Sequence, residues 1–81
     1  MLEVSLSGSL RDATDGAASI EIEARTIREL LRKLVERYPR LQSRIDEGVA
    51  VSVNGEIYRD NRDVPIPEGA EVFLLPRIQG G

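Results

Sequence analysis

The sequence predicts an α+β fold in which a mixed sheet packs on one main amphipathic helix. Three observations predict it. Residues 2–6 and 19–24 alternate between apolar and polar side chains, as half-buried strands do. Residues 26–38 carry apolar side chains three and four positions apart, which is the spacing of one helix face. Residues 72–75 are all apolar, which is typical of a strand buried on both faces.

The two alternating segments are expected to form a hairpin with one face toward the core. The segment between them is rich in Ser, Gly and Asp and predicts a polar loop, in which Leu10 is able to fill the edge of the core. The inward side chains of the two strands are Leu2, Val4, Leu6, Ile20 and Ile22.

The helix has recognisable start and stop signals. Thr26 and Glu29 have the spacing of a capping box. Pro39 disfavours helical geometry at Tyr38 and predicts the end of the helix there. Two i, i+4 ion pairs are expected on the exposed face, namely Glu29–Lys33 and Arg32–Glu36.

The second half of the chain predicts one short helix and more strands. Residues 40–48 are expected to add a helical turn that ends at Gly48, with Leu41 and Ile45 facing inward. A strand over 49–53 meets Asn54-Gly55, which is a strong hairpin signal.

The last strand follows a turn at 67–69 and runs from Glu71 to Leu75. Because it is the most apolar strand, we expect it in the centre of the sheet, beside the first strand. If so, Phe73 and Leu75 face away from Val72 and Leu74, because side chains alternate along a strand. Phe73 and Leu75 are therefore a candidate docking surface for a partner protein.

Composition removes several classes of function. The 81 residues contain no cysteine and no histidine, which excludes disulfides, zinc fingers, thiol catalysis and a histidine general base. A net charge of −3 with mixed signs does not form the basic stripe of a nucleic-acid-binding protein. Asp60 and Asp63 are expected to be turn residues and not metal ligands, because no third ligand is near them in sequence.

Membrane and targeting signals are missing from the sequence. No apolar run is long enough to span a bilayer. Residues 1–10 lack the charged and apolar regions of a signal peptide. We therefore expect a cytoplasmic protein that binds neither membrane nor nucleic acid and holds no cofactor or metal of its own.

Residues 77–81 are expected to form a flexible Gly-Gly tail outside a domain of residues 1–76. Pro76 cannot donate to a sheet ladder and is a natural end for the last strand. Five extended residues reach about 16–18 Å, which is enough to enter a pocket of another protein. Gly80 and Gly81 have no Cβ atoms and therefore fit a narrow channel.

The carboxylate of Gly81 needs a leaving group before it can react. The simplest is an adenylate formed from ATP, which a sulfur nucleophile or an amine can then displace. Neither step requires a cysteine or a histidine in this chain. Chain ends are often disordered and a Gly-Gly end can be accidental. Its place after an apolar strand and a proline, in a small α+β domain, favours a carrier.

Four segments resemble a known family: SGSLRD (7–12), TIRELLRKLVERYPRL (26–41), VNGE (53–56), and IPEGAEVFLLP (66–76) with the closing GG. They resemble the segment after the first strand, the first helix, the turn after the third strand and the closing stretch of the ubiquitin-like sulfur carriers. This family includes the small subunit of molybdopterin synthase and the thiamine-pathway sulfur carrier. The resemblance covers the whole length and implies a β-grasp (ubiquitin-like) roll.

The resemblance also implies a function. In that family an E1-like adenylating enzyme uses ATP to activate the terminal glycine, and a sulfurtransferase or cysteine desulfurase system converts it to a thiocarboxylate. In the molybdopterin branch, the tail enters the large catalytic subunit of molybdopterin synthase. By position, Gly81 would bear the thiocarboxylate, and the chain would be a carrier and not an enzyme. The residues that would thread the partner's channel are Gly80, Gln79, Ile78 and Arg77.

The tail departs from the family's pattern at two positions. Arg77 stands where the family often has proline, and Gln79 stands where it often has a small residue. A larger Gln79 requires a wider channel in the partner. The long segment between the first two strands favours the molybdopterin type over the thiamine type.

Two other functions remain open at this point. A ubiquitin-like modifier would use the same adenylate but join Gly81 to lysines of target proteins. A plain binding module would use the folded body and ignore the tail. Sequence alone does not separate these functions from that of a sulfur carrier.

Overall fold

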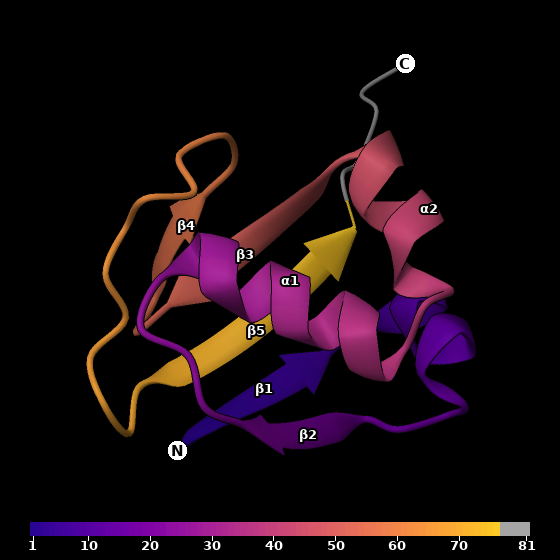
Figure 1. Ribbon diagram of the computed structural model, residues 1–81, viewed down its shortest axis with the longest axis horizontal. Helices are drawn as coiled ribbons and strands as arrows, with labels where there is room; N and C mark the ends of the chain where they lie inside the picture. Colours follow the sequence, from indigo (N-terminus) through magenta and orange to yellow (C-terminus); the bar gives the residue numbers. More distant parts are fainter. Residues whose placement is uncertain (77–81) are drawn as a thin grey trace.

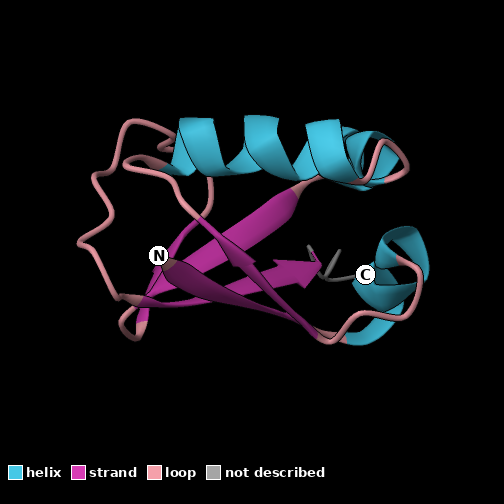
Figure 2. Cartoon of the chain, turned by 60° about the horizontal axis from the view of Figure 1, so that its bottom comes forward, coloured by secondary structure: helices cyan, strands magenta, loops and turns pink. Residues whose placement is uncertain are grey.

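A mixed sheet of five strands forms one layer of the structure, and helix α1 lies across one face of it (Figures 1 and 2). The computed structural model describes residues 1–76. Its elements, in chain order, are β1 (Leu2–Leu6), the 3₁₀-helix η1 (Gly8–Thr14), β2 (Ser19–Ile22), α1 (Ile27–Arg37), α2 (Leu41–Glu47), β3 (Val49–Val53), β4 (Glu56–Tyr58) and β5 (Glu71–Pro76).

The strand order in the sheet is β2-β1-β5-β3-β4. The last strand therefore occupies the centre, as predicted, and pairs with the first strand in parallel. Its other neighbour, β3, is antiparallel to it. The two outer pairs, β1–β2 and β3–β4, are antiparallel hairpins. Asn54 and Gly55 join β3 to β4 with positive φ angles of 49° and 91°, as the Asn-Gly signal predicts.

The core lies between α1 and the inner face of the sheet. It is aliphatic, because Phe73, Tyr38 and Tyr58 are the only aromatic residues and none of them is fully buried. Burial of these aliphatic side chains supplies the main driving force for folding. The most deeply buried members are Leu2, Val4, Leu10, Ile27, Leu30, Leu34, Leu41, Val51, Val72 and Leu74.

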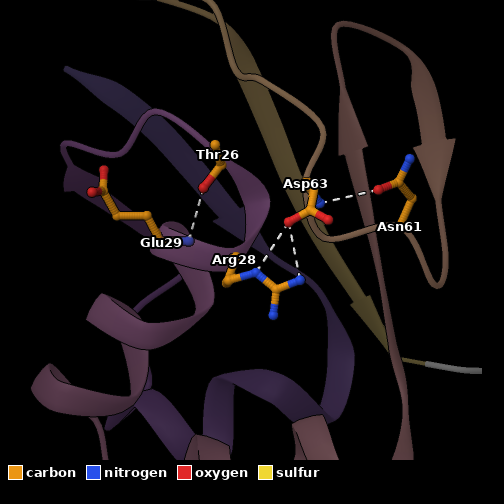
Figure 3. A network of polar contacts seen from close by, with 5 residues as sticks. All are labelled: Thr26, Arg28, Glu29, Asn61 and Asp63. Carbon is orange, nitrogen blue, oxygen red and sulfur yellow. Dashed lines mark hydrogen bonds and ion pairs between the residues drawn. The ribbon is translucent and has the colours of Figure 1, made fainter.

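Two capping hydrogen bonds mark the start of helix α1, and Figure 3 shows the first of them. The hydroxyl of Thr26 accepts a hydrogen bond from the backbone N–H of Glu29 at 3.1 Å. The carboxylate of Glu29 reaches back to the N–H of Arg25 at 2.8 Å, one residue before the position that a standard capping box uses. The helix ends before Pro39, with Tyr38 as its last capping residue, as predicted.

The segment between β4 and β5 is tied to the first turn of α1. The backbone N–H groups of Ile27 and Arg28 donate to the carbonyls of Val64 and Arg62, at 3.1 and 2.8 Å. The guanidinium of Arg28 donates twice to the Asp63 carboxylate, at 3.0 and 3.1 Å (Figure 3). Two otherwise unpaired donors of the helix N-terminus are thus satisfied by the loop.

Two surface predictions on α1 have different outcomes. Arg32 and Glu36 form the expected ion pair, at 3.7 Å. The expected pair of Lys33 with Glu29 is wrong, because Lys33 donates instead to the carbonyl of Glu23 at 2.7 Å. Arg37 likewise donates to the carbonyl of Glu21, at 3.0 Å. Both side chains thereby occupy backbone acceptors beside the edge strand β2, which protects that edge from pairing with another chain.

The predicted polar loop between β1 and β2 contains η1, so the loop prediction is wrong for residues 8–14. Leu10 and Ala13 are buried there, and Leu10 fills the edge of the core as expected. Buried backbone groups need hydrogen-bond partners, and helical turns provide some of them. The buried hydroxyl of Thr14 lies 3.2 Å from the Arg11 carbonyl and 3.0 Å from that of Ala17.

The expectation that β5 is buried on both faces is also wrong. Val72 and Leu74 are buried, but the side chain of Phe73 is 38% exposed. The reason is that α1 covers only one face of the sheet, while η1 sits at one end of it (Figure 2). A central strand in a two-layer fold has one covered face, however apolar its sequence is.

Thr26→Ala is expected to lower the free energy of unfolding by about 1 kcal/mol, because it removes the cap of α1. Urea denaturation monitored by circular dichroism measures this loss. Thr26→Ser keeps the hydroxyl and serves as the control, with a smaller loss. Equal losses in the two variants would mean that the hydroxyl does not stabilise the helix.

Candidate functional site

Strand β5 is paired on both sides as far as Leu74, and with β3 alone from Leu75 to Pro76. Leu74 is paired with Leu6 of β1 and with Val51 of β3, and Pro76 lies opposite Val49. The rigid centre of the sheet therefore fixes where residue 77 begins. Figure 1 shows that β5 finishes on the same side of the molecule as α2.

The predicted tail residues lie outside the described residues. These are Arg77, Ile78, Gln79, Gly80 and Gly81. Their predicted roles remain predictions, and so does the boundary between a domain of residues 1–76 and a tail. What the structure describes is the surface that surrounds the start of this segment.

The face of the sheet opposite α1, which we call the open face, is the candidate site. No helix of residues 1–76 lies across it (Figure 2). Phe73 and Leu75 both belong to it, because they alternate with the buried Val72 and Leu74. Its residues are Glu3, Ser5, Ser19, Glu21, Ala50, Ser52, Ile57, Glu71, Phe73 and Leu75.

Small side chains flank Phe73 on both neighbouring strands. Ser5 of β1 and Ser52 of β3 are its direct cross-strand partners. Ile57 of β4 is in turn the cross-strand partner of Ser52 and is 58% exposed. Leu75 lies one row further along, opposite Ala50. The result is an apolar patch in which the ring of Phe73 stands between short side chains.

Sequence reasoning found two residues of this patch and missed the others. Ala50 belongs to β3 and Ile57 to β4, and their approach to Phe73 depends on the register of three strands. The sequence signal was Ile57 itself, an apolar side chain in a short strand that the hairpin places on the same face as Ser52. That signal becomes readable only when the pairing of β3 with β5 is known.

Residues 1–76 hold no group of three or more carboxylates placed to bind a metal ion. The phenol of Tyr58 donates to the carboxylate of Glu56 at 2.7 Å, and this hydrogen bond raises the pKa of Tyr58, so the phenol stays neutral near pH 7. Asp63 accepts from Arg28, and its backbone N–H donates to the side-chain oxygen of Asn61 at 3.0 Å, so it is a structural residue.

A shallow pocket between η1 and α2 is a weaker candidate. Its two arginines already have acidic partners. Arg40 pairs with Asp15, and Arg44 pairs with Glu47 at 3.7 Å. The pocket has a volume of about 250 Å³ and is lined by Asp12, Ala13, Arg40, Ser43 and Arg44. We therefore place the site on the open face and the end of β5.

Within residues 1–76, neither the length nor the apolar character of any helix is sufficient to cross a bilayer.

Comparison with known proteins gives one family and a group of similar structures. The family model described as the ThiS family matches residues 4–81. No curated protein matches the chain.

Among solved structures, the CysO chain of the BexX/CysO complex of Amycolatopsis orientalis is 24% identical, with a TM-score of 0.82 and 100% of both chains covered. SAMP1 of Haloferax volcanii, a small archaeal modifier protein, is 25% identical, with a TM-score of 0.79 and coverage of 99% of this chain and 98% of the other. The complex of subunits 1 and 2 of the molybdopterin-converting factor of Helicobacter pylori 26695 contains a chain that is 25% identical, with a TM-score of 0.69 and coverage of 99% and 97%. These similarities confirm the predicted β-grasp fold.

The two faces of β5 are expected to respond differently to truncation. Phe73→Ala should lower the free energy of unfolding by about 1 kcal/mol or less, because the side chain contributes mainly cross-strand contacts. Leu74→Ala should lower it by about 2–5 kcal/mol, because it leaves a cavity in the core. Urea denaturation of the two variants measures both losses, and equal losses would contradict the assignment of the open face.

Proposed function

Because the chain belongs to the ThiS family of ubiquitin-like sulfur carriers, we propose that Gly81 is the residue that carries sulfur. In this proposal an E1-like enzyme adenylates the Gly81 carboxylate with ATP, releasing pyrophosphate. The persulfide sulfur of a sulfurtransferase or cysteine desulfurase then displaces AMP and forms an acyl disulfide with Gly81. A second thiol of the partner cleaves its S–S bond, which releases the thiocarboxylate and leaves a disulfide on the partner. ATP is bound by the partner, so this chain contributes no catalytic side chain.

The observation that carries the proposal is the position of β5. The strand is central, paired on both sides, and leads directly into residues 77–81. An activated terminus has to enter the active sites of other proteins. It therefore needs a fixed starting position and a length of several residues. Five extended residues span about 16–18 Å, which suits that task. Gly80, Gln79, Ile78 and Arg77 are the proposed threading residues.

We further propose that the accepting pathway is synthesis of the molybdenum cofactor, with this chain as the small subunit of molybdopterin synthase. Similarity to a chain in the complex of molybdopterin-converting factor subunits 1 and 2 supports this choice. The proposed partner is then the large catalytic subunit, which would receive the tail. A thiamine-pathway carrier is the alternative within the same family.

A ubiquitin-like modifier is the second candidate function, and similarity to a small archaeal modifier protein favours it. The two functions differ in the nucleophile that displaces AMP, which is sulfur in one case and a lysine amine in the other. Lys33 is the only lysine of the 81 residues. Any conjugate between side chain and tail within copies of this protein must therefore form at Lys33.

Reconstitution with the E1-like enzyme and ATP separates the candidates. With a sulfur donor, intact mass is expected to show one sulfur-for-oxygen exchange at Gly81, and no conjugates. Deletion of Gly80 and Gly81 should abolish the exchange. Lys33→Arg is the control that removes self-conjugation without changing the charge.

Gel-stable conjugates to other proteins, without the mass exchange, would support the modifier instead. A truncated chain that keeps full activity in cells lacking the native copy would show that the tail is not the working part.

Phe73→Ala should weaken binding to the E1-like enzyme, because it removes the centre of the apolar patch on the open face. We expect a loss of affinity of about tenfold or more, since central aromatic residues often dominate interfaces. Isothermal titration calorimetry measures the affinity, with Ile57→Ala as a comparison at the rim of the patch. An unchanged affinity for Phe73→Ala would place the docking surface elsewhere.

A further inference from the structure

Three glutamates form one row across the open face. Glu3 of β1 is the direct cross-strand partner of Glu21 of β2 and of Glu71 of β5. All three side chains are exposed, while their neighbours along each strand are buried against α1. We call these three residues the acidic row.

The acidic row works against folding stability. Like charges directly opposite each other on neighbouring strands destabilise a sheet. The N–H of Leu6 donates to the carbonyl of Ala18, which makes Glu3–Glu21 a non-hydrogen-bonded pair, the type with the closest side chains. Among the ion pairs of residues 1–76, none includes a glutamate of the row. No ion pair of the described residues therefore offsets the charge of the acidic row.

The shape of the acidic row fits several separate cations better than one metal ion. Neighbouring strands lie about 4.8 Å apart, so the row extends about 10 Å from Glu21 to Glu71. In agreement with this spread, no three carboxylates of the described residues lie close enough together to hold one metal ion. Lysine and arginine side chains on a protein surface can match such a spread.

The acidic row adjoins the apolar patch. It lies at the end of the patch that is farther from the tail. Along β5, the open face presents Glu71, then Phe73, then Leu75, and residue 77 follows Pro76. The distance from Glu71 to Leu75 is about 13 Å, at about 3.3 Å per residue. A partner that accepts the tail and covers Phe73 thus extends naturally over the carboxylates.

We propose that the acidic row is the charged half of the docking surface, and that the E1-like enzyme carries a cluster of lysines and arginines to match it. The cluster lies about 16 Å from Pro76, after which the tail begins, measured along β5 at about 3.3 Å per residue. The row speeds association and sets the direction in which β5 lies on the enzyme, because complementary charges steer an encounter and fix its register. This inference rests on the proposed function and names the chemistry of the partner.

The test compares two triple variants that remove the same charge. Glu3→Gln, Glu21→Gln and Glu71→Gln together neutralise the acidic row. Glu36→Gln, Asp46→Asn and Glu47→Gln together neutralise three carboxylates on the helices and serve as the control. Association with the E1-like enzyme is measured by stopped flow at several salt concentrations, and thermal unfolding is measured on the same samples.

The row variant is expected to associate at least about tenfold more slowly at low salt and to lose most of the salt dependence. Its unfolding temperature should be unchanged or higher, because a repulsion has been removed. The control should associate within about twofold of the wild-type rate. Slower binding together with equal or greater stability cannot come from damage to the fold.

Equal association rates for the two triple variants would overturn this inference while the proposed function stands. Failure of the enzyme to adenylate the wild-type chain would overturn the proposed function, and this inference with it. The adenylation assay, read as release of pyrophosphate, keeps the two failures distinguishable.

Discussion

The parallel pairing of β1 with β5 is the constraint on which the rest of the structure depends. It brings the first strand and the last described strand together in the centre of the sheet. Parallel neighbours cannot be joined by a tight turn, so the chain between them has to cross over the sheet. Helix α1 lies on that crossover, and its apolar stripe closes the core over the inner face. The hairpin partners β2 and β4 complete the sheet at its two edges.

This arrangement places the two faces of β5 in different surroundings. Val72 and Leu74 are buried and stabilise the fold, while Phe73 and Leu75 face outward on the open face. If Phe73 and Leu75 dock a partner as proposed, stability and partner binding can change independently, because the two pairs of residues lie on opposite faces. The same central position fixes the origin of residues 77–81, so a change at the edges of the sheet need not displace the tail.

Much of the fold was predictable because the signals are local. The alternation of residues 2–6, the period of α1 and the Asn54-Gly55 turn each depend on neighbours in sequence. The arrangement of the strands was predictable only in part, since the apolar run of β5 correctly indicated a central strand but wrongly indicated burial on both faces. The 3₁₀-helix at 8–14 was missed because its Ser, Gly and Asp content is that of a loop, and only the burial of Leu10 distinguishes it.

The candidate site was predictable only in part. Phe73 and Leu75 follow from alternation within one strand, whereas the acidic row combines glutamates from three strands and exists only through their register. The tail residues were chosen on chemical grounds and lie outside the described part of the chain. Their role is therefore tested by chemical measurements on the protein in solution.

The most direct measurement is the intact mass of the protein isolated from its native cells, with fragmentation to locate any change. The account predicts a fraction in which one oxygen of Gly81 is replaced by sulfur, increasing when the acceptor of that sulfur is removed. Finding Gly81 only as a free carboxylate under that condition, or only in isopeptide bonds to other proteins, would contradict it.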